Sequence, residues 1–225
     1  MAILFNGSSQ YLKTSTSSLF NLTNITCCCW ITTTTTSPSW QSAFSYNISG
    51  TSNTIYGVGL YQGKPATEVS QSSGTFTNLI SSAAVTTNTW YHIAMSYNGS
   101  TLILYVNGVQ NSTQSVSYTL PSTTNYLTIG GDNSNGTIAN FLNGSAEDAR
   151  IYNRVLSANE VSTINNSKGK DGIFYGLVSR WNMNELGVGS TVATAYDMSS
   201  NKLNATSVAS PTYSAGVENP TRNYI

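Results

Sequence analysis

The chain has 225 residues, and its nine acidic and nine basic side chains give a formal net charge of zero. Only 8% of its residues are charged, whereas soluble domains typically reach about 25%. Without a basic surface to neutralise phosphates, nucleic acid is excluded as an expected partner. The length suits one large all-β domain, so we expect a single domain over residues 1–225.

The N-terminal segment Met1–Gly7 carries neither a charged stretch nor a long apolar one, so no signal peptide is expected. No run approaches the ~18 apolar residues of a membrane span. The three cysteines are consecutive. On a strand, Cys27 and Cys29 should share one face and Cys28 the other. This spacing suits neither a disulfide framework nor a zinc site, and it indicates three small apolar residues in a buried strand.

Short extended segments, separated by Gly, Asn and Pro turns, follow one another along the chain. The expected segments are 2–5, 9–12, 25–36, 40–48, 54–61, 68–72, 75–80, 90–97, 101–106, 115–120, 126–130, 138–142, 146–152, 177–183, 191–197 and 205–208. Asn98-Gly99 and Asn107-Gly108 are strong turn signals because both residue types tolerate a positive φ. Residues 90–108 therefore predict a meander, whereas residues 132–136 predict a polar loop.

One helix is expected. Ser157 and Glu160 form the pattern of a capping box, which predicts a short helix over residues 158–165. Many short strands at a spacing of roughly 8–12 residues, with a single helix, are typical of a two-sheet antiparallel sandwich or jelly roll.

Several segments resemble the signature of laminin-G-like, concanavalin-A-like jelly-roll domains. They are Phe5–Leu12 (FNGSSQYL), Trp90–Ala94 (WYHIA), Leu102–Gly108 (LILYVNG), Leu127–Gly131 (LTIGG), Phe141–Gly144 (FLNG) and Glu147–Ser157 (EDARIYNRVLS). Each segment is a weak signal alone, but their order and spacing make the combination specific, and the main match covers residues 1–165. The resemblance implies a concanavalin-A-like jelly roll with two antiparallel sheets and one short helix.

The C-terminal part departs from the family pattern. Residues 176–185 and 197–206 resemble segments that in the family precede the opening strand, yet here they come last. Either the domain is circularly permuted or a tandem array was cut in mid-repeat. We favour permutation, because chain ends that lie close together make it easy. Residues 173–210 would then supply permuted closing strands, and residues 211–225 a tail.

Catalysis is not expected. Some members of this superfamily carry a catalytic Glu-x-Asp-x-x-Glu strand, and the nine acidic residues contain no such motif. Glu147 and Asp148 are adjacent, so they should face opposite ways on a strand. His92 is the only histidine, and its position in a strand predicts a core or cross-strand residue. We therefore predict that the protein is not an enzyme.

The resemblance also implies a structural Ca²⁺, held by an Asp and backbone carbonyls. The candidate ligands are Asp132, Glu147, Asp148 and Asp197. The alternative is a carboxylate at a strand edge that pairs with Arg150 or caps a loop.

A sugar ligand would stack on exposed aromatic rings and accept or donate hydrogen bonds to Asn and Asp. The candidates are Trp40, Tyr46, Tyr56, Tyr61 and Tyr126, together with Asn133. The alternative for each ring is a place in the two-sheet core. A recognition site should lie on loops such as 50–53, 63–66 and 132–136.

The function expected from these features is that of a non-catalytic structural or adhesive module on a particle surface. A phage or virus virion accessory protein, of the capsid-decoration or tail-fibre type, fits the charge-poor polar composition and the absent signal peptide, with glycan binding as an added role. Its partners would be other virion or surface proteins and further copies of the chain. The alternatives are a secreted carbohydrate-binding module of a larger polysaccharide-active protein and, third, a hydrolase.

Overall fold

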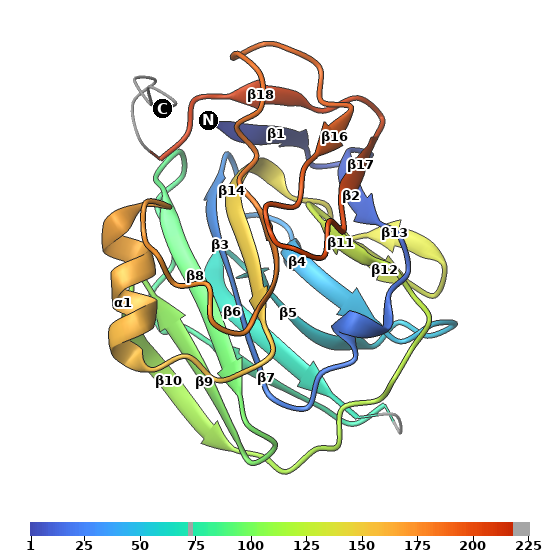
Figure 1. The fold of residues 1–225 in the computed structure, drawn as a ribbon, viewed down its shortest axis with the longest axis vertical. Helices are drawn as coiled ribbons and strands as arrows, with labels where there is room; N and C mark the ends of the chain where they lie inside the picture. The colour runs from blue at the N-terminus through green and yellow to red at the C-terminus, as the bar shows by residue number, and fades with distance from the viewer. Residues whose placement is uncertain (72–73, 218–225) are drawn as a thin grey trace.

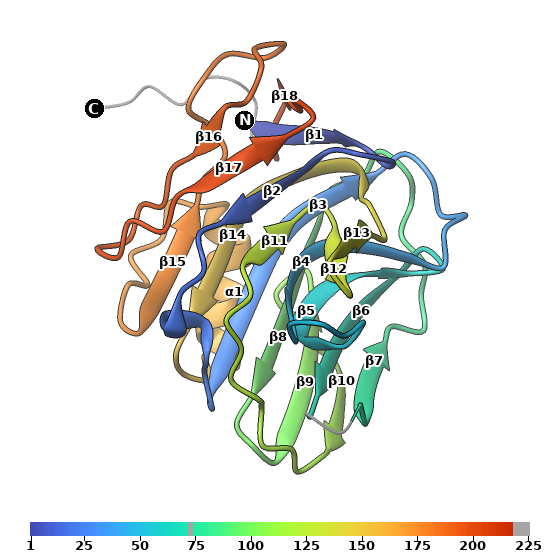
Figure 2. The same ribbon diagram turned by 90° about the vertical axis from the view of Figure 1, so that its right-hand side faces the viewer.

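A computed structural model describes residues 1–71 and 74–217. It shows two antiparallel sheets packed face to face with one α-helix outside them (Figures 1 and 2). This is the two-sheet jelly-roll sandwich that the sequence predicted.

Sheet A, the sheet beneath the helix, has eight described strands. Their order is β10 (Val109–Ser115), β9 (Thr101–Val106), β8 (Tyr91–Tyr97), β3 (Ile25–Thr33), β14 (Asn143–Tyr152), β1 (Ala2–Asn6) and β18 (Thr212–Ser214), with β15 (Leu177–Trp181) also paired to β14.

Sheet B also has eight described strands. Their order is β16 (Thr194–Ala195), β17 (Ala205–Val208), β2 (Tyr11–Thr14), β11 (Leu127–Ile129), β4 (Trp40–Asn47), β5 (Thr54–Tyr61), β6 (Lys64–Ser70) and β7 (Phe76–Ile80). A separate hairpin of β12 (Asp132–Ser134) and β13 (Thr137–Ala139) lies beside β4, and a 3-10 turn, η1, covers Ser18–Phe20 (Figure 2).

The main core fills the space between the sheets. Alternation along β3 places Cys27 and Cys29 in this core and Cys28 on the opposite face, as predicted, and all three thiols are free and buried. Trp181 from β15 is fully buried and packs near the rings of Phe20 and Phe44. The cysteine triplet is therefore a packing feature.

The helix α1 (Ala158–Ser167) covers the outer face of sheet A. The capping box of Ser157 and Glu160 is present as predicted. Val161 and Ile164 are buried in a second cluster that includes Cys28, so the helix is held by apolar burial as well as by its cap. No helix in residues 1–71 and 74–217 has the length and hydropathy that crossing a membrane requires.

The meander β8–β9–β10 confirms the predicted turns of residues 90–108. Other segments differ from the prediction. Residues 116–120, expected to continue an extended segment from Ser115, form no strand, because β10 ends at Ser115. Residues 132–139, expected to begin as a loop, form the β12–β13 hairpin. Thr212–Ser214, expected in a tail, forms β18, where Tyr213 pairs with Ile3 and is buried in the core. A strand of three residues leaves too short a pattern to find from sequence.

The C-terminal strands join both sheets, since β15 and β18 extend sheet A while β17 pairs with β2 in sheet B (Figure 1). β18 lies directly beside β1, so the described end of the chain adjoins its start. Circular permutation remains a prediction that this geometry would permit.

Candidate functional site

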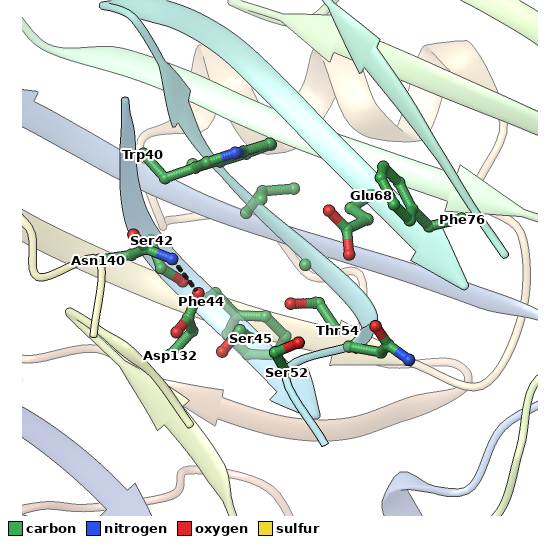
Figure 3. A pocket seen from close by; sticks show the side chains of 14 residues that line it. Trp40, Ser42, Phe44, Ser45, Ser52, Thr54, Glu68, Phe76, Asp132 and Asn140 are labelled. Carbon is green, nitrogen blue, oxygen red and sulfur yellow. Dashed lines mark hydrogen bonds between the residues drawn. The ribbon is translucent and has the colours of Figure 1, made fainter. Parts of the chain in front are cut away.

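A hollow opens on the outer face of sheet B, over β4, β5 and β6 (Figure 3). Its cavity volume is about 220 Å³, which is smaller than the roughly 300–1,000 Å³ of sites for drug-sized ligands. The residues around it are Trp40, Ser42, Phe44, Ser45, Ser52, Asn53, Thr54, Gly57, Val58, Gly59, Glu68, Phe76, Asp132 and Asn140.

Two small residues, on β4 and β5, form the floor of the hollow, and they lie in register with Glu68 on β6. Ser45 lies opposite Gly57, and Gly57 lies opposite Glu68. Their chain neighbours Tyr46, Tyr56 and Val69 belong to the core, so alternation turns the floor residues outward. The hollow exists because serine and glycine occupy positions where other strands carry large side chains.

The glycines of β5 also permit a bulged strand beside them. The register of β4 against β5 shifts between Ser42 and Phe44. A Cβ on Gly59 would collide with the backbone oxygen of Gln41, and one on Gly57 would lie 2.7 Å from the backbone oxygen of Phe44. Close backbone approach therefore requires glycine at both positions.

Aromatic rings flank the hollow. Trp40 packs against Tyr61 with 5.2 Å between ring centroids, and Phe76, at the start of β7, is 56% exposed. In Figure 3 the Trp40 and Phe76 side chains lie on either side of the opening. They give the site apolar surface that faces solvent.

Two carboxyl groups lie on opposite sides of the hollow, Glu68 from β6 and Asp132 from β12 (Figure 3). Asn140 donates a hydrogen bond from Nδ2 to Asp132 Oδ2 at 2.7 Å, whereas the buried Oδ1 of Asp132 has no partner. Burial raises the pKa of Glu68 to about 7, and the charge of Asp132 adds to the rise. Burial also raises the pKa of Asp132, against the effect of the Asn140 hydrogen bond.

Of the five predicted ligand aromatics, one lines the hollow, one packs against that residue and three lie elsewhere. Trp40 lines it, and Tyr61 supports Trp40 from the side. The prediction was wrong for Tyr56, which is fully buried and donates its hydroxyl to the Phe20 backbone oxygen at 2.7 Å. Tyr46 is likewise fully buried. Both fill the core, which was the alternative for each ring.

Tyr126 and Asn133 lie apart from the hollow. Lys13 stands over the Tyr126 ring at 5.5 Å from its centroid, so one ring face is already covered. Asn133 is buried and donates to Asn125 Oδ1 at 2.9 Å. Its amide nitrogen serves an internal hydrogen bond while its Oδ1 has no partner, and its role in ligand binding stays a prediction.

Two of the three predicted recognition loops border the hollow. Ser52, Asn53 and Asp132 belong to loops 50–53 and 132–136, and the backbone N–H of Asn135 donates to Thr51 at 2.6 Å, which ties the loops together. The residues of the third loop, 63–66, do not line the hollow. Most of this predicted loop is part of strand β6, which begins at Lys64.

Sequence reasoning missed Glu68, Phe76 and Asn140. The only local signal for Glu68 was its charge: apart from Lys64 at the start, the other residues of the strand Lys64–Ser70 are uncharged.

The candidate calcium ligands are engaged elsewhere. Asp148 accepts from Arg150 Nη2 at 2.6 Å and from Arg180 Nε at 2.7 Å. Asp197 is buried and accepts backbone N–H groups at 2.8–2.9 Å in the loop after it and from β15. Glu147 lies 3.5 Å from the N-terminal ammonium.

Among the described residues, no group of three or more His, Cys, Asp or Glu side chains could hold a metal ion. The oxygens of Asp148 and Asp197 already serve an ion pair and a loop cap, so these residues do not fit a calcium ion. Asp132 stands with one other carboxyl group, which also falls short of the six to eight oxygens that calcium takes.

Solved structures share this fold. A candidate carbohydrate-binding protein from Bacteroides ovatus aligns with a TM-score of 0.67 at 15% identity, over 95% of this chain and 60% of its own length. A heptameric SAP-like pentraxin from Limulus polyphemus aligns at 0.64 and 16% identity, over 83% and 89%.

The CBM40 domain of the Ruminococcus gnavus IT-sialidase, bound to α2,3-sialyllactose, aligns at 0.59 and 21% identity, over 73% and 95%. At these identities the likeness establishes the fold alone.

The sequence comparisons agree with the fold. No curated protein sequence matches the chain. The family model described as the concanavalin A-like lectin/glucanases superfamily matches residues 6–162, which is more than half of the chain. The chain therefore belongs to the concanavalin A-like lectin/glucanase superfamily.

Proposed function

We propose that the protein is a non-catalytic glycan-binding module whose ligand occupies the hollow over β4, β5 and β6. The observation that carries the proposal is the combination in one hollow of a half-buried Trp40, a floor without large side chains, and polar groups with spare hydrogen-bonding capacity. The solved relatives described as carbohydrate-binding support the same class of ligand.

The proposed contacts follow from the chemistry of a pyranose. One face of the ring carries C–H groups and packs on an aromatic surface, here Trp40. The hydroxyl groups around the ring both donate and accept hydrogen bonds. Asp132, Glu68 and Asn140 supply acceptors and donors at the edge of that ring.

A glycan array tests this directly with the wild-type protein and two variants. We expect binding to at least one glycan, lost in Trp40→Ala and retained in Tyr126→Ala, an aromatic change outside the hollow. Thermal melting of each variant would control for folding. No binding on a broad array, or equal binding by Trp40→Ala, would overturn the proposal.

For the biological setting, we propose a structural or adhesive role on a particle surface, such as that of a phage or virus virion accessory protein. A surface made of neutral Ser, Thr and Asn side chains supports contact with other proteins and with glycans. A secreted carbohydrate-binding module of a larger polysaccharide-active protein is supported about equally by the same fold and hollow.

Co-sedimentation separates these settings. A particle protein should sediment with purified particles in fixed stoichiometry, together with other copies of the chain. Recovery of the chain only in the soluble secreted fraction, joined to a catalytic domain, would contradict the particle role and support the secreted module.

A hydrolase is the second candidate, and the specific observation in its favour is that Glu68 and Asp132 share one hollow. Glycoside hydrolysis needs two carboxyl groups flanking the scissile bond. The two residues here come from separate elements, β6 and β12, without the Glu-x-Asp-x-x-Glu strand. A reducing-sugar assay on any bound glycan should show no release, and release that Glu68→Gln abolishes would overturn the non-catalytic assignment.

A further inference from the structure

The charge of the hollow narrows the class of ligand. Of the described residues that line it, Glu68 and Asp132 are acidic and no Lys, Arg or His is present. Lys64 lies on the same face of β6 but four residues from Glu68, which is about 13 Å along a strand. An acidic ligand placed here would meet two carboxyl groups without a compensating cation.

We propose that the hollow selects a sugar that carries a free, protonated amine and rejects acidic sugars, with the amine seated between Glu68 and Asp132. This inference rests on the glycan-binding function proposed above. It sets the protein apart from the CBM40 relative, whose bound sialyllactose is an acidic sugar.

The geometry favours a cation at this place. The buried Oδ1 of Asp132 has no hydrogen-bond partner, while Oδ2 accepts from Asn140. An ammonium group has three donors and no acceptor, so it suits an unpartnered carboxylate oxygen, and the negative charge of Glu68 on the other side of the hollow favours it further. The positive charge of the amine would offset the negative charges of the two carboxylates, and this attraction is strong because water screens the half-buried site only in part.

A backbone hydrogen bond from Thr54, at the start of β5, favours the ionised form of Glu68, and the residues opposite Glu68 on its two neighbouring strands are uncharged. β5 places Gly57 opposite Glu68, and β7 places Asn78 there. Asp132 is the charged group that acts on Glu68 from β12. Because burial raises the pKa of Glu68 to about 7, a sugar whose amine stays protonated should bind more tightly at pH 7 than at pH 5.5, as the carboxyl group ionises.

An array of matched sugars tests the proposal. Each series holds a hexosamine with a free amine, its N-acetyl form, the parent hexose and the corresponding hexuronic acid, in the gluco, galacto and manno configurations. In at least one series we expect the amine form to bind at least tenfold more tightly than the hexose, and the uronic acid to show the weakest binding.

Glu68→Gln and Asp132→Asn keep the shape of the site and remove its charge. Each should reduce amine binding and flatten its dependence on pH and salt, and the loss for the amine should exceed the loss for the parent hexose at least fivefold. Both variants should melt as cooperatively as the wild type, which separates loss of charge from loss of fold.

The outcomes are distinguishable. Equal binding of the amine and the hexose, both lost in Trp40→Ala, would overturn the charge selection while the glycan site stands. Preference for the uronic acid or for sialyllactose would overturn it as well. No binding by any member of the three series, with none on the broad array, would overturn the glycan-binding function itself.

Discussion

The two sheets carry acidic residues on their outer faces in opposite ways. On sheet A, Arg150 of β14 pairs with Asp148 of the same strand and with Asp171 of the segment after α1, at 2.6 and 2.8 Å. On sheet B, Glu68 and Asp132 face an open hollow in which no described cation stands. The same residue type is therefore neutralised on one face and left available on the other.

The pKa directions follow this difference. Burial alone would raise the pKa of Asp148, but Arg150 and Arg180 outweigh it and lower the pKa. Burial raises the pKa of Glu68, where no cation opposes it. A carboxylate that is paired inside the protein stabilises the fold, whereas one that lacks a cation weakens it and is open to a ligand.

Removing the central cation of sheet A should have the largest effect. Arg150→Met leaves two buried carboxylates short of a partner, so the free energy of unfolding should fall by about 3–5 kcal/mol. Arg154→Met is the matched control, because Arg154 and Glu160 form a partly exposed pair whose loss should cost about 1 kcal/mol or less. Urea unfolding at pH 7 measures both, and equal losses would contradict the special role of Arg150.

The buried His92 of sheet A should make the stability of the fold depend on pH. It is fully buried against Trp30, its ring nitrogens have no partner, and burial with the Arg150 charge lowers its pKa to about 4. Between pH 6.5 and 4 the unfolded chain binds a proton that the folded chain does not, so stability falls as pH falls. By linkage the loss is about 2–3 kcal/mol. Urea unfolding of His92→Phe from pH 7 to 4 should lack this part of the loss, and an unchanged pH profile would refute the assignment.

On sheet B, a glycine that lines the hollow should be required for the close approach of β4 and β5. Gly59→Ala places a methyl group against the backbone oxygen of Gln41, which should cost about 1–3 kcal/mol. Gly187→Ala is the matched control, since a Cβ there meets nothing within 4 Å and should change stability by less than about 0.5 kcal/mol. Similar denaturation midpoints for the two variants would mean that the close strand approach does not require glycine.

Glu68→Gln should show the smallest effect, with a pH dependence opposite to that of His92. Between pH 4.5 and 7 the folded chain holds a proton on Glu68 that the unfolded chain has lost, so wild-type stability falls as pH rises. The variant lacks this loss and should exceed the wild type by about 1 kcal/mol more at pH 8 than at pH 4, an amount reduced for partial solvent screening. Parallel stability curves for the two proteins would argue that Glu68 is not buried as described.

Much of the fold was predictable because its signals are local. Paired Asn-Gly turns predicted the meander, alternation predicted the split of the cysteines, and Ser157 with Glu160 predicted the helix start. The pairing of β18 with β1 joins residues about 210 positions apart. No pattern within three residues can encode such a partner.

The site was predictable only in part, because it depends on which strands become neighbours. Trp40 was predicted, but the hollow arises from the row Ser45, Gly57 and Glu68, on three strands. Alternation alone would have improved one choice: Tyr56 and Tyr61 are five residues apart on β5, so they face opposite ways. The sequence could not say which of the two faces the core.

The central claim is that the ligand binds against Trp40, and the indole N–H signals of the protein test it most directly. The chain has four tryptophans, Trp30, Trp40, Trp90 and Trp181, and each gives one signal in a ¹⁵N-correlated NMR spectrum. Titration with a glycan that binds should shift the Trp40 signal strongly and leave the other three nearly unchanged. A strong shift of Trp90 with an unmoved Trp40 would place the ligand elsewhere and contradict the account.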